Sequence, residues 1–260
     1  MTIANPATIV LPPPMTAPIV YPESDGEPMA NNSVQFRYIT TIEGNLEILL
    51  EEQSDVLVAG DMFWYPVEGN NTIRQAPDIM VVWGRPKGDR GSYLQWEEDE
   101  IVPQVVFEIL SPGNRKQEML NKFVFYERYG AEEYYLYDPD RGRLQGWLRN
   151  AQGRFVEITR MKGWRSPRLQ IRFDLLGREL LLYYPDGKRF LTFLELNQRR
   201  AQAEARADRE AARAHAEAEA RAEAEQARLI AEQALAAAEA RMREMEERLR
   251  QAGVAVSTGN

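Results

Sequence analysis

The chain contains no cysteine and only one histidine, His215. Without cysteine it can form neither disulfides nor thiolate metal sites, which fits a reducing compartment, and we expect a cytoplasmic protein. His215 lies in an alanine- and glutamate-rich stretch typical of a solvated helix, so a histidine-based metal centre or acid–base pair is excluded as well. The chain also lacks the GxxxxGK(S/T) and GxGxxG patterns, which argues against nucleotide hydrolysis.

Long apolar runs and excess positive charge are missing too. No apolar run approaches the roughly 20 residues that span a bilayer, and Met1–Val20 has no lysine or arginine to form the basic region of a signal peptide. We therefore expect no membrane association. The net charge of −8 argues against strong nonspecific nucleic-acid binding, but it is compatible with a local basic loop beside a metal-loaded acidic site.

Aromatic residues are absent after Phe193, and all five tryptophans lie between Trp64 and Trp164. The packed part is therefore expected to end near residue 190. We expect a proline-rich extended arm over residues 1–33, an α/β domain over 34–189, a long helix over 190–252 and a disordered tail over 253–260. For residues 1–15, a plain disordered segment is the alternative.

Residues 198–250 contain no glycine or proline and are dominated by alanine, glutamate and arginine, which predicts one long helix. Five residues of this helix recur at alternating three- and four-residue steps, the spacing of a coiled-coil seam: Leu235, Ala238, Met242, Met245 and Leu249. The favoured interpretation is a self-pairing helix that makes a homodimer. A single solvated helix held by Glu–Arg pairs is the alternative.

The preceding part predicts an α/β layer with a mixed sheet. Apolar periodicity predicts a helix over 35–52, although Gly44-Asn45 weakens the prediction of an unbroken one. A second helix is predicted over 115–129. Short apolar runs predict strands at 55–59, 62–65, 76–82, 104–110, 133–137, 144–148, 155–158 and 180–184.

Two of these strands each carry one carboxylate within an apolar run, Asp78 and Glu108. Burying a lone ionised carboxylate is costly, so two acids in one apolar layer indicate a shared Mg²⁺ (or Mn²⁺), a hard cation that takes oxygen ligands. Lys122, on the helix after the second strand, would hold a scissile phosphate or help to activate water. From spacing alone, ordinary capped or paired acids stay the alternative.

Four motifs together resemble the Uma-two family of restriction endonucleases, a branch of the PD-(D/E)XK nuclease superfamily. The resemblance covers about residues 35–185 and rests on Pro77-Asp78-Ile79, the run from Phe107 to Pro112, Lys122 with Tyr126, and the run from Gly130 to Pro139. It implies an α-β-β-β-α-β nuclease core and metal-dependent hydrolysis of DNA, with Asp78 and Glu108 as metal ligands and catalytic residues.

The chain departs from the superfamily pattern at the motif lysine. Leu110 stands two residues after Glu108, where the motif has lysine. The resemblance implies that the lysine has moved to the following helix, which points to Lys122 as the third catalytic residue.

Two further acids are candidates for auxiliary roles. Glu43 on the first helix resembles the auxiliary acid of some members of the superfamily, although Glu47 or Glu51 would serve as well. Glu133 begins a strand near the same edge, and a structural role is an equal alternative for it.

The loop over residues 84–100 is long for a hairpin connection, and long loops tend to be functional. It contains Arg85, Lys87 and Arg90, which are candidates for contacts with a nucleic-acid backbone. An ordinary solvated loop is the alternative.

The sequence thus predicts a Mg²⁺-dependent endonuclease that cuts DNA as a homodimer. The competing hypothesis is a nuclease-like core that has lost its chemistry and works as an adaptor through the long helix. The acidic net charge and Leu110 in the place of the motif lysine favour that alternative.

Overall fold

The computed structural model describes residues 19–24, 26, 32–114 and 116–251. The chain divides into two compact units, residues 1–194 and 195–260, and each is considered by itself. Most of the predicted N-terminal arm and the whole predicted C-terminal tail lie outside the described residues.

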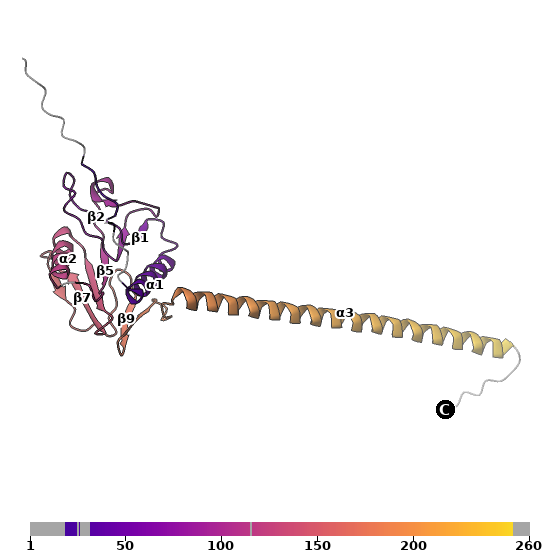
Figure 1. The fold of residues 1–260 in the computed structure, drawn as a ribbon. Coiled ribbons are helices and arrows are strands. Elements are labelled where there is room, and N and C mark those ends of the chain that lie inside the picture. Colours follow the sequence, from indigo (N-terminus) through magenta and orange to yellow (C-terminus); the bar gives the residue numbers. More distant parts are fainter. Residues whose placement is uncertain (1–18, 25, 27–31, 115, 252–260) are drawn as a thin grey trace, which may run out of the picture. The chain divides into compact units, whose positions relative to one another are not determined.

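The first unit is built on a six-stranded mixed sheet in the order β1-β3-β5-β6-β7-β8 (Figure 1). Only β5 and β6 pair in parallel, and the other neighbours are antiparallel. The strands are β1 Val56–Gly60, β3 Ile79–Trp83, β5 Val105–Ile109, β6 Glu133–Asp138, β7 Arg143–Arg149 and β8 Phe155–Glu157. With the two helices below, α1, β1, β3, β5, α2 and β6 follow each other in the order α-β-β-β-α-β, which confirms the predicted core.

Helix α1, Ser33–Leu49, begins where the Asn32 side chain accepts hydrogen bonds from the backbone N–H groups of Val34 and Gln35. It continues unbroken through Gly44 and Asn45. Asn45 is buried, and its amide group donates to the backbone oxygens of Thr41 and Leu191. These bonds hold the helix at the point where the sequence predicted a weakness.

The two faces of the sheet have separate cores. On one face α1 packs with the hairpin of β9, Arg172–Leu176, and β10, Glu179–Tyr183. On the other face lies α2, Lys116–Tyr129, which buries Phe125 and Tyr126. Figure 1 shows β5 between the two helices. The face on which a strand residue lies therefore decides which helix it meets.

The region around residues 62–100 differs from the prediction. β2, Trp64–Tyr65, stays outside the main sheet and pairs in parallel with β4, Tyr93–Leu94. A short 3₁₀ helix, Gln95–Glu97, follows β4. The long loop is therefore structured, and strand β9 was not predicted at all.

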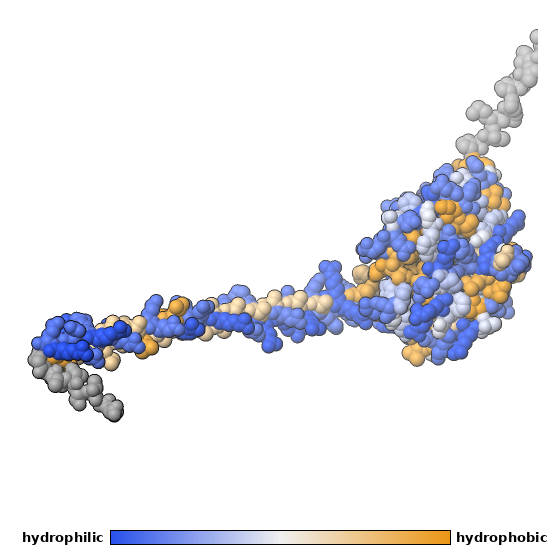
Figure 2. Space-filling view, turned by 180° about the vertical axis from the view of Figure 1, so that it is seen from behind, coloured by the Kyte–Doolittle hydropathy of each residue, from blue (hydrophilic) through white to orange (hydrophobic). Residues whose placement is uncertain are grey.

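Helix α3, Phe193–Gln251, confirms the predicted long helix, with 59 residues and no buried one. Arginine–glutamate pairs four residues apart lie along it, for example Arg213–Glu217 and Arg228–Glu232. Figure 2 shows a mainly hydrophilic surface with scattered apolar positions. Within the described part of the chain, no helix has both the length and the hydrophobicity to cross a membrane.

Candidate metal-binding and catalytic site

Asp78 and Glu108 lie opposite each other on neighbouring antiparallel strands. Asp78 immediately precedes β3, and Glu108 lies in β5. The register pairs Ile79 with Phe107, so one further step places Asp78 opposite Glu108. Directly opposite residues of an antiparallel pair have Cβ atoms about 4.5–5.5 Å apart. Two acids distant in sequence thus become cross-strand neighbours.

Both carboxylates project from the same face of the sheet. Side chains alternate along a strand, and Asp78 and Glu108 share the parity of Met80 and Val106, which belong to the core under α2. Asp78 is 8% exposed and Glu108 only 2%. The two acids are therefore enclosed together between the sheet and α2.

The backbone of Ile109 fixes the position of Asp78. The N–H group of Ile109 donates to Oδ2 of Asp78 at 2.6 Å. The carbonyl of Ile109 accepts a bond of 2.8 Å from the side-chain amide of Gln35 on α1. One residue of β5 thus links the acid on one face of the sheet to the helix on the other.

Two side chains of α2 hold Glu108. The ammonium of Lys122 lies 2.8 Å and 3.0 Å from the two carboxylate oxygens of Glu108 and 3.2 Å from the carbonyl oxygen of Ala76. The hydroxyl of Tyr126 donates to Oε1 of Glu108 at 2.6 Å. Residues four apart lie on the same helix face, so Lys122 and Tyr126 reach the carboxylate together.

The electrostatics of the site follow from this crowding. Burial and repulsion by Glu108 raise the pKa of Asp78 to about 8. Burial also raises the pKa of Glu108, although Lys122 opposes that shift. For Lys122, burial lowers the pKa, but the two carboxylates outweigh it and the net pKa is raised. Lys122 therefore stays charged, and the ionised site carries two negative charges against one positive.

Tyr134 supplies an unpaired polar group beside these acids. Its hydroxyl is the one buried side-chain polar atom without a hydrogen-bond partner among the residues described. Burial raises the pKa of Tyr134 well above its usual range, and the charges of Glu108 and Asp78 raise it further. A buried hydroxyl without a partner is costly, and a water on a bound cation would supply one.

The donor set fits a hard divalent cation. Two carboxylates with excess negative charge suit Mg²⁺, which keeps several water ligands and is often held by only one or two protein carboxylates. The described residues contain no group of three or more acids or histidines that would hold a metal. The protein would thus contribute Asp78 and Glu108, and water or substrate oxygens would fill the other positions.

The two auxiliary candidates lie in different places. The carboxylate of Glu43 reaches the backbone of Gly60, the residue paired with Ile79 at the same end of the sheet as Asp78. Glu133 lies on the opposite face from Glu108, at the other end of the parallel pair. Its carboxylate accepts bonds from Tyr135, Ser166 and Arg168.

The basic residues of loop 84–100 are engaged in structural contacts. Arg85 and Arg90 both form ion pairs with Glu98, and the Lys87 ammonium donates to the backbone oxygens of Leu50 and Glu51. The loop leaves β3 at Trp83, the far end from Asp78. It is therefore remote from the two carboxylates.

Sequence reasoning gave no role to Tyr126, Tyr134 or the polar side chain of Gln35. The four-residue step from Lys122 to Tyr126 on a predicted helix was the available signal for the first. The contact of Gln35 with Ile109 joins residues 74 apart in the sequence and leaves no local pattern.

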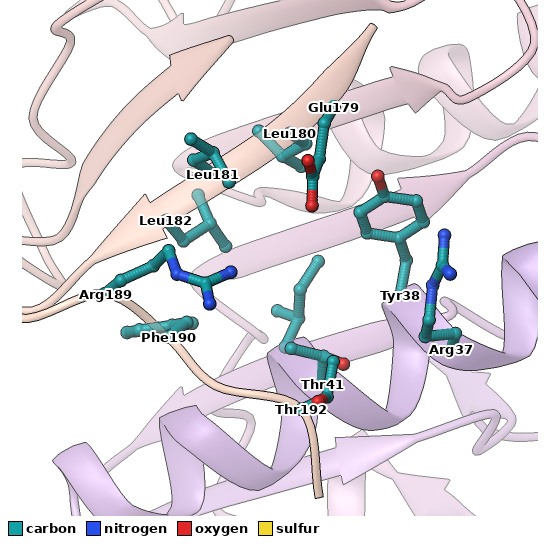
Figure 3. A pocket seen from close by; sticks show the side chains of 11 residues that line it. Arg37, Tyr38, Thr41, Glu179, Leu180, Leu181, Leu182, Arg189, Phe190 and Thr192 are labelled. Carbon is teal, nitrogen blue, oxygen red and sulfur yellow. The ribbon is translucent and has the colours of Figure 1, made fainter. Parts of the chain in front are cut away.

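A cavity lies on the other face of the sheet, between α1 and β10 (Figure 3). Arg37, Tyr38, Glu179 and Arg189 line it, and its volume is about 50 Å³. That space holds about one or two waters. It does not adjoin Asp78 or Glu108, so we do not assign the chemistry to it.

Comparison with known proteins relates the chain to a sequence family and to solved structures. The sequence model of the Uma2 family, described as “Putative restriction endonuclease”, matches residues 21–173. The chain is also similar to a crystal structure described as a “putative nuclease belonging to DUF820” from Anabaena variabilis, with 14% identity and a TM-score of 0.39 over 52% of this chain and 72% of the other. No curated protein matches the chain.

Proposed function

The chain belongs to the Uma2 family, and from this membership and the geometry of the acid pair we propose that it is a Mg²⁺- or Mn²⁺-dependent endonuclease that hydrolyses DNA phosphodiester bonds. The observation that carries the proposal is the juxtaposition of Asp78 and Glu108 on one buried face, with the Lys122 ammonium at 2.8 Å from Glu108. Two acids that hold a divalent ion, with an amine beside them, can support metal-dependent phosphodiester hydrolysis.

In this proposal Asp78 and Glu108 hold the divalent ion. When bound, such an ion lowers the pKa of a coordinated water and neutralises the charge that develops on the phosphate. The Ile109 N–H group orients Asp78, and Tyr126 and Lys122 orient Glu108. The chain thus prearranges both carboxylates before any ligand arrives.

Lys122 has a second role. Its ammonium contacts Glu108 and the carbonyl of Ala76, just before the Pro77-Asp78 motif. A charged group at this junction can hold the scissile phosphate or orient the attacking water. In this proposal Lys122 has the role that the motif lysine would have at position 110.

We further propose that α3 pairs two copies of the chain in parallel. Four large apolar residues of the predicted seam are 38–64% exposed in the single chain: Leu235, Met242, Met245 and Leu249. Burying such residues against a second copy removes apolar area from water. Cutting both strands of a duplex is simplest with two active sites, which gives the dimer a mechanistic use.

The charges beside the seam support the parallel orientation. With Leu235 and Met242 at heptad position a, Arg241 and Arg248 fall at g, whereas Glu239 and Glu246 fall at e. In a parallel dimer g faces e of the other helix, so Arg241 would meet a glutamate. An antiparallel dimer would instead place like charges together.

The test of the activity is cleavage of plasmid DNA with and without Mg²⁺ or Mn²⁺. We expect metal-dependent nicking or linearisation that Asp78→Asn and Glu108→Gln each abolish, while circular dichroism and thermal melting show a folded protein. Arg165→Gln, a change at an exposed residue far from the acids, is the matched control and should cut normally. Full activity in either acid variant would reject the proposal.

The adaptor without catalysis is the second candidate. Leu110 in the place of the motif lysine is the observation that favours it. The ion pair between Lys122 and Glu108 favours the nuclease instead. The two candidates differ in metal binding, because an adaptor has no need to take up Mn²⁺.

A further inference from the structure

A basic pocket opens on the same face of the sheet as Glu108. Its volume is about 350 Å³, and it is lined by Lys116 at the start of α2, by Arg141 in the turn before β7 and by Arg143 at the start of β7. Leu110 and Leu136 contribute apolar lining. These five residues, together with Asp138 and Gln145, are called the basic pocket.

The register places this pocket beside the acid pair. Leu136 of β6 is the direct partner of Glu108 of β5. Leu110 follows Glu108 by two residues and projects from the same face. On the next strand Gln145, which also lines the pocket, pairs with Leu136. Because neighbouring strands lie about 4.8 Å apart, the pocket begins next to Glu108 and extends about 10 Å from it.

The charge of the pocket differs from that of the chain. The whole chain carries −8, but the pocket has three cations and one acid, Asp138. That acid already accepts two bonds from Arg141, at 3.0 Å and 2.9 Å. Neither Lys116 nor Arg143 forms an ion pair with another residue in the described ranges. Two uncompensated cations therefore face the pocket.

Resting on the proposed nuclease activity, we propose that the basic pocket binds a backbone phosphate of the DNA strand that is being cut. A phosphodiester is the ligand class that these side chains suit. Arginine and lysine commonly donate hydrogen bonds to phosphate oxygens, and the pocket has room for the group. Leu110 occupies the position of the PD-(D/E)XK motif lysine, so no lysine side chain from that position fills the pocket.

The distance limits which phosphates of the strand can reach the pocket. DNA rises about 3.4 Å per nucleotide along one strand. A pocket that ends about 10 Å from Glu108 therefore holds a phosphate within about three nucleotides of the one at the acid pair. Its function is to set the position of the strand, and it carries no base specificity.

The experiment measures binding of a mixed-sequence 20-base-pair DNA duplex by full-length protein carrying Asp78→Asn, so that no strand is cut. Lys116→Gln and Arg143→Gln are added singly, with Arg165→Gln as the matched control. Arg165 adjoins Ser166, which contacts Glu133 at the other end of β6. Circular dichroism and melting check that each variant is folded.

We expect Lys116→Gln and Arg143→Gln each to weaken binding roughly three- to tenfold at about 0.1 M salt and to reduce the slope of log K against log salt by about one. Arg165→Gln should change neither quantity, and Arg143→Lys should keep the slope. With Asp78 intact, the same two variants should raise KM for cleavage and leave kcat nearly unchanged.

Other outcomes separate the two proposals. If the pocket variants bind the duplex as Arg165→Gln does while cleavage persists, the phosphate site is wrong and the nuclease assignment stands. If the unsubstituted protein neither binds nor cuts DNA, both are wrong. Tighter, pocket-dependent binding of an RNA of the same sequence would overturn the assignment to DNA.

Discussion

The ammonium of Lys122 lies 2.8 Å from Oε2 of Glu108 and 3.2 Å from the carbonyl oxygen of Ala76. Lys122 is on the second turn of α2, and its side chain is only 13% exposed. The ion pair supplies a buried positive charge beside Glu108 although Leu110 occupies the motif position. Predictions about the site depend on this pair.

Removing the lysine should destabilise the protein as well as inactivate it. Lys122→Met leaves Glu108 buried without its cation, and breaking a buried pair in this way costs about 3–5 kcal/mol. We expect a loss in that range at pH 8, measured by urea unfolding in EDTA. The loss should shrink toward pH 5. Burial raises the pKa of Glu108 in the folded protein, so Glu108 is protonated at low pH and its buried charge destabilises the protein only as the pH rises.

The double variant Lys122→Met/Glu108→Gln is the control for this prediction. With both charges of the Lys122–Glu108 pair removed, its stability should return to within about 1–2 kcal/mol of the unsubstituted protein, while cleavage stays absent. A double variant as unstable as Lys122→Met alone would mean that packing by the lysine stem, and not the charge pair, sets the effect.

Tyr134 and Tyr135 are adjacent tyrosines with opposite surroundings. The Tyr134 hydroxyl is buried beside the acids without a partner, whereas the Tyr135 hydroxyl donates to Glu133 at 2.8 Å. Tyr134→Phe should therefore leave the melting temperature unchanged or raise it, yet weaken Mn²⁺ binding severalfold.

Tyr135→Phe should do the reverse. It should cost about 1–2 kcal/mol of stability, since Glu133 loses a bonded partner, and leave Mn²⁺ affinity unchanged. Equal Mn²⁺ affinities in the Tyr134→Phe and unsubstituted proteins would remove Tyr134 from the site.

Metal affinity should depend on pH through Asp78. Its pKa of about 8 means that the carboxyl is mostly protonated at neutral pH without metal. The proton must leave before the carboxylate binds a cation. Mn²⁺ affinity should therefore rise about tenfold per pH unit below 8 and level off above it, as measured by calorimetry. A flat affinity between pH 6 and 8 would contradict the raised pKa of Asp78.

The parallel pairing of α3 can be tested by cross-linking, because the chain has no cysteine of its own. Ala231→Cys, at a seam position one heptad before Ala238, should form a disulfide dimer under mild oxidation. In an antiparallel pair, residue 231 would lie near residue 249 of the other helix, about 27 Å from its own copy at 1.5 Å per residue. In that case only a mixture of Ala231→Cys and Leu249→Cys proteins would cross-link.

The contribution of the apolar seam can be tested with two leucines of α3, one on the seam and one off it. Leu235 lies on the seam and Leu229 does not, and both are exposed, at 63% and 52%. Leu235→Glu should convert the dimer to a monomer in light scattering, and Leu229→Glu should leave it a dimer. Identical behaviour of the two variants would reject this seam.

The fold was largely predictable where local pattern and packing agree. Apolar runs gave β1, β3, β5 and β6, and alanine- and glutamate-rich composition gave α3, because both patterns are local. The continuity of α1 was not predictable, since Asn45 is held by Leu191, which lies 146 residues away. The exclusion of β2 from the main sheet was also not predictable, because its partner, β4, lies in a loop whose sequence showed no strand pattern.

For the site, the acids were easier to predict than the cations. A carboxylate inside an apolar strand stands out because its burial needs compensation. An arginine in a polar segment gives no such signal, so Arg85 and Arg90 could not be told apart from Arg143 by sequence. Their ion pairs with Glu98, and the position of Arg143 in the same pocket as Leu136, the register partner of Glu108, appear only after folding.

The most direct test of the central claim, that Asp78 and Glu108 share one divalent cation, is titration of the metal-free protein with Mn²⁺ by calorimetry at pH 8. We predict one ion per chain for the unsubstituted protein, and no measurable binding for Asp78→Asn or Glu108→Gln. Binding that survives in either variant, or no binding in the unsubstituted protein, would contradict the claim.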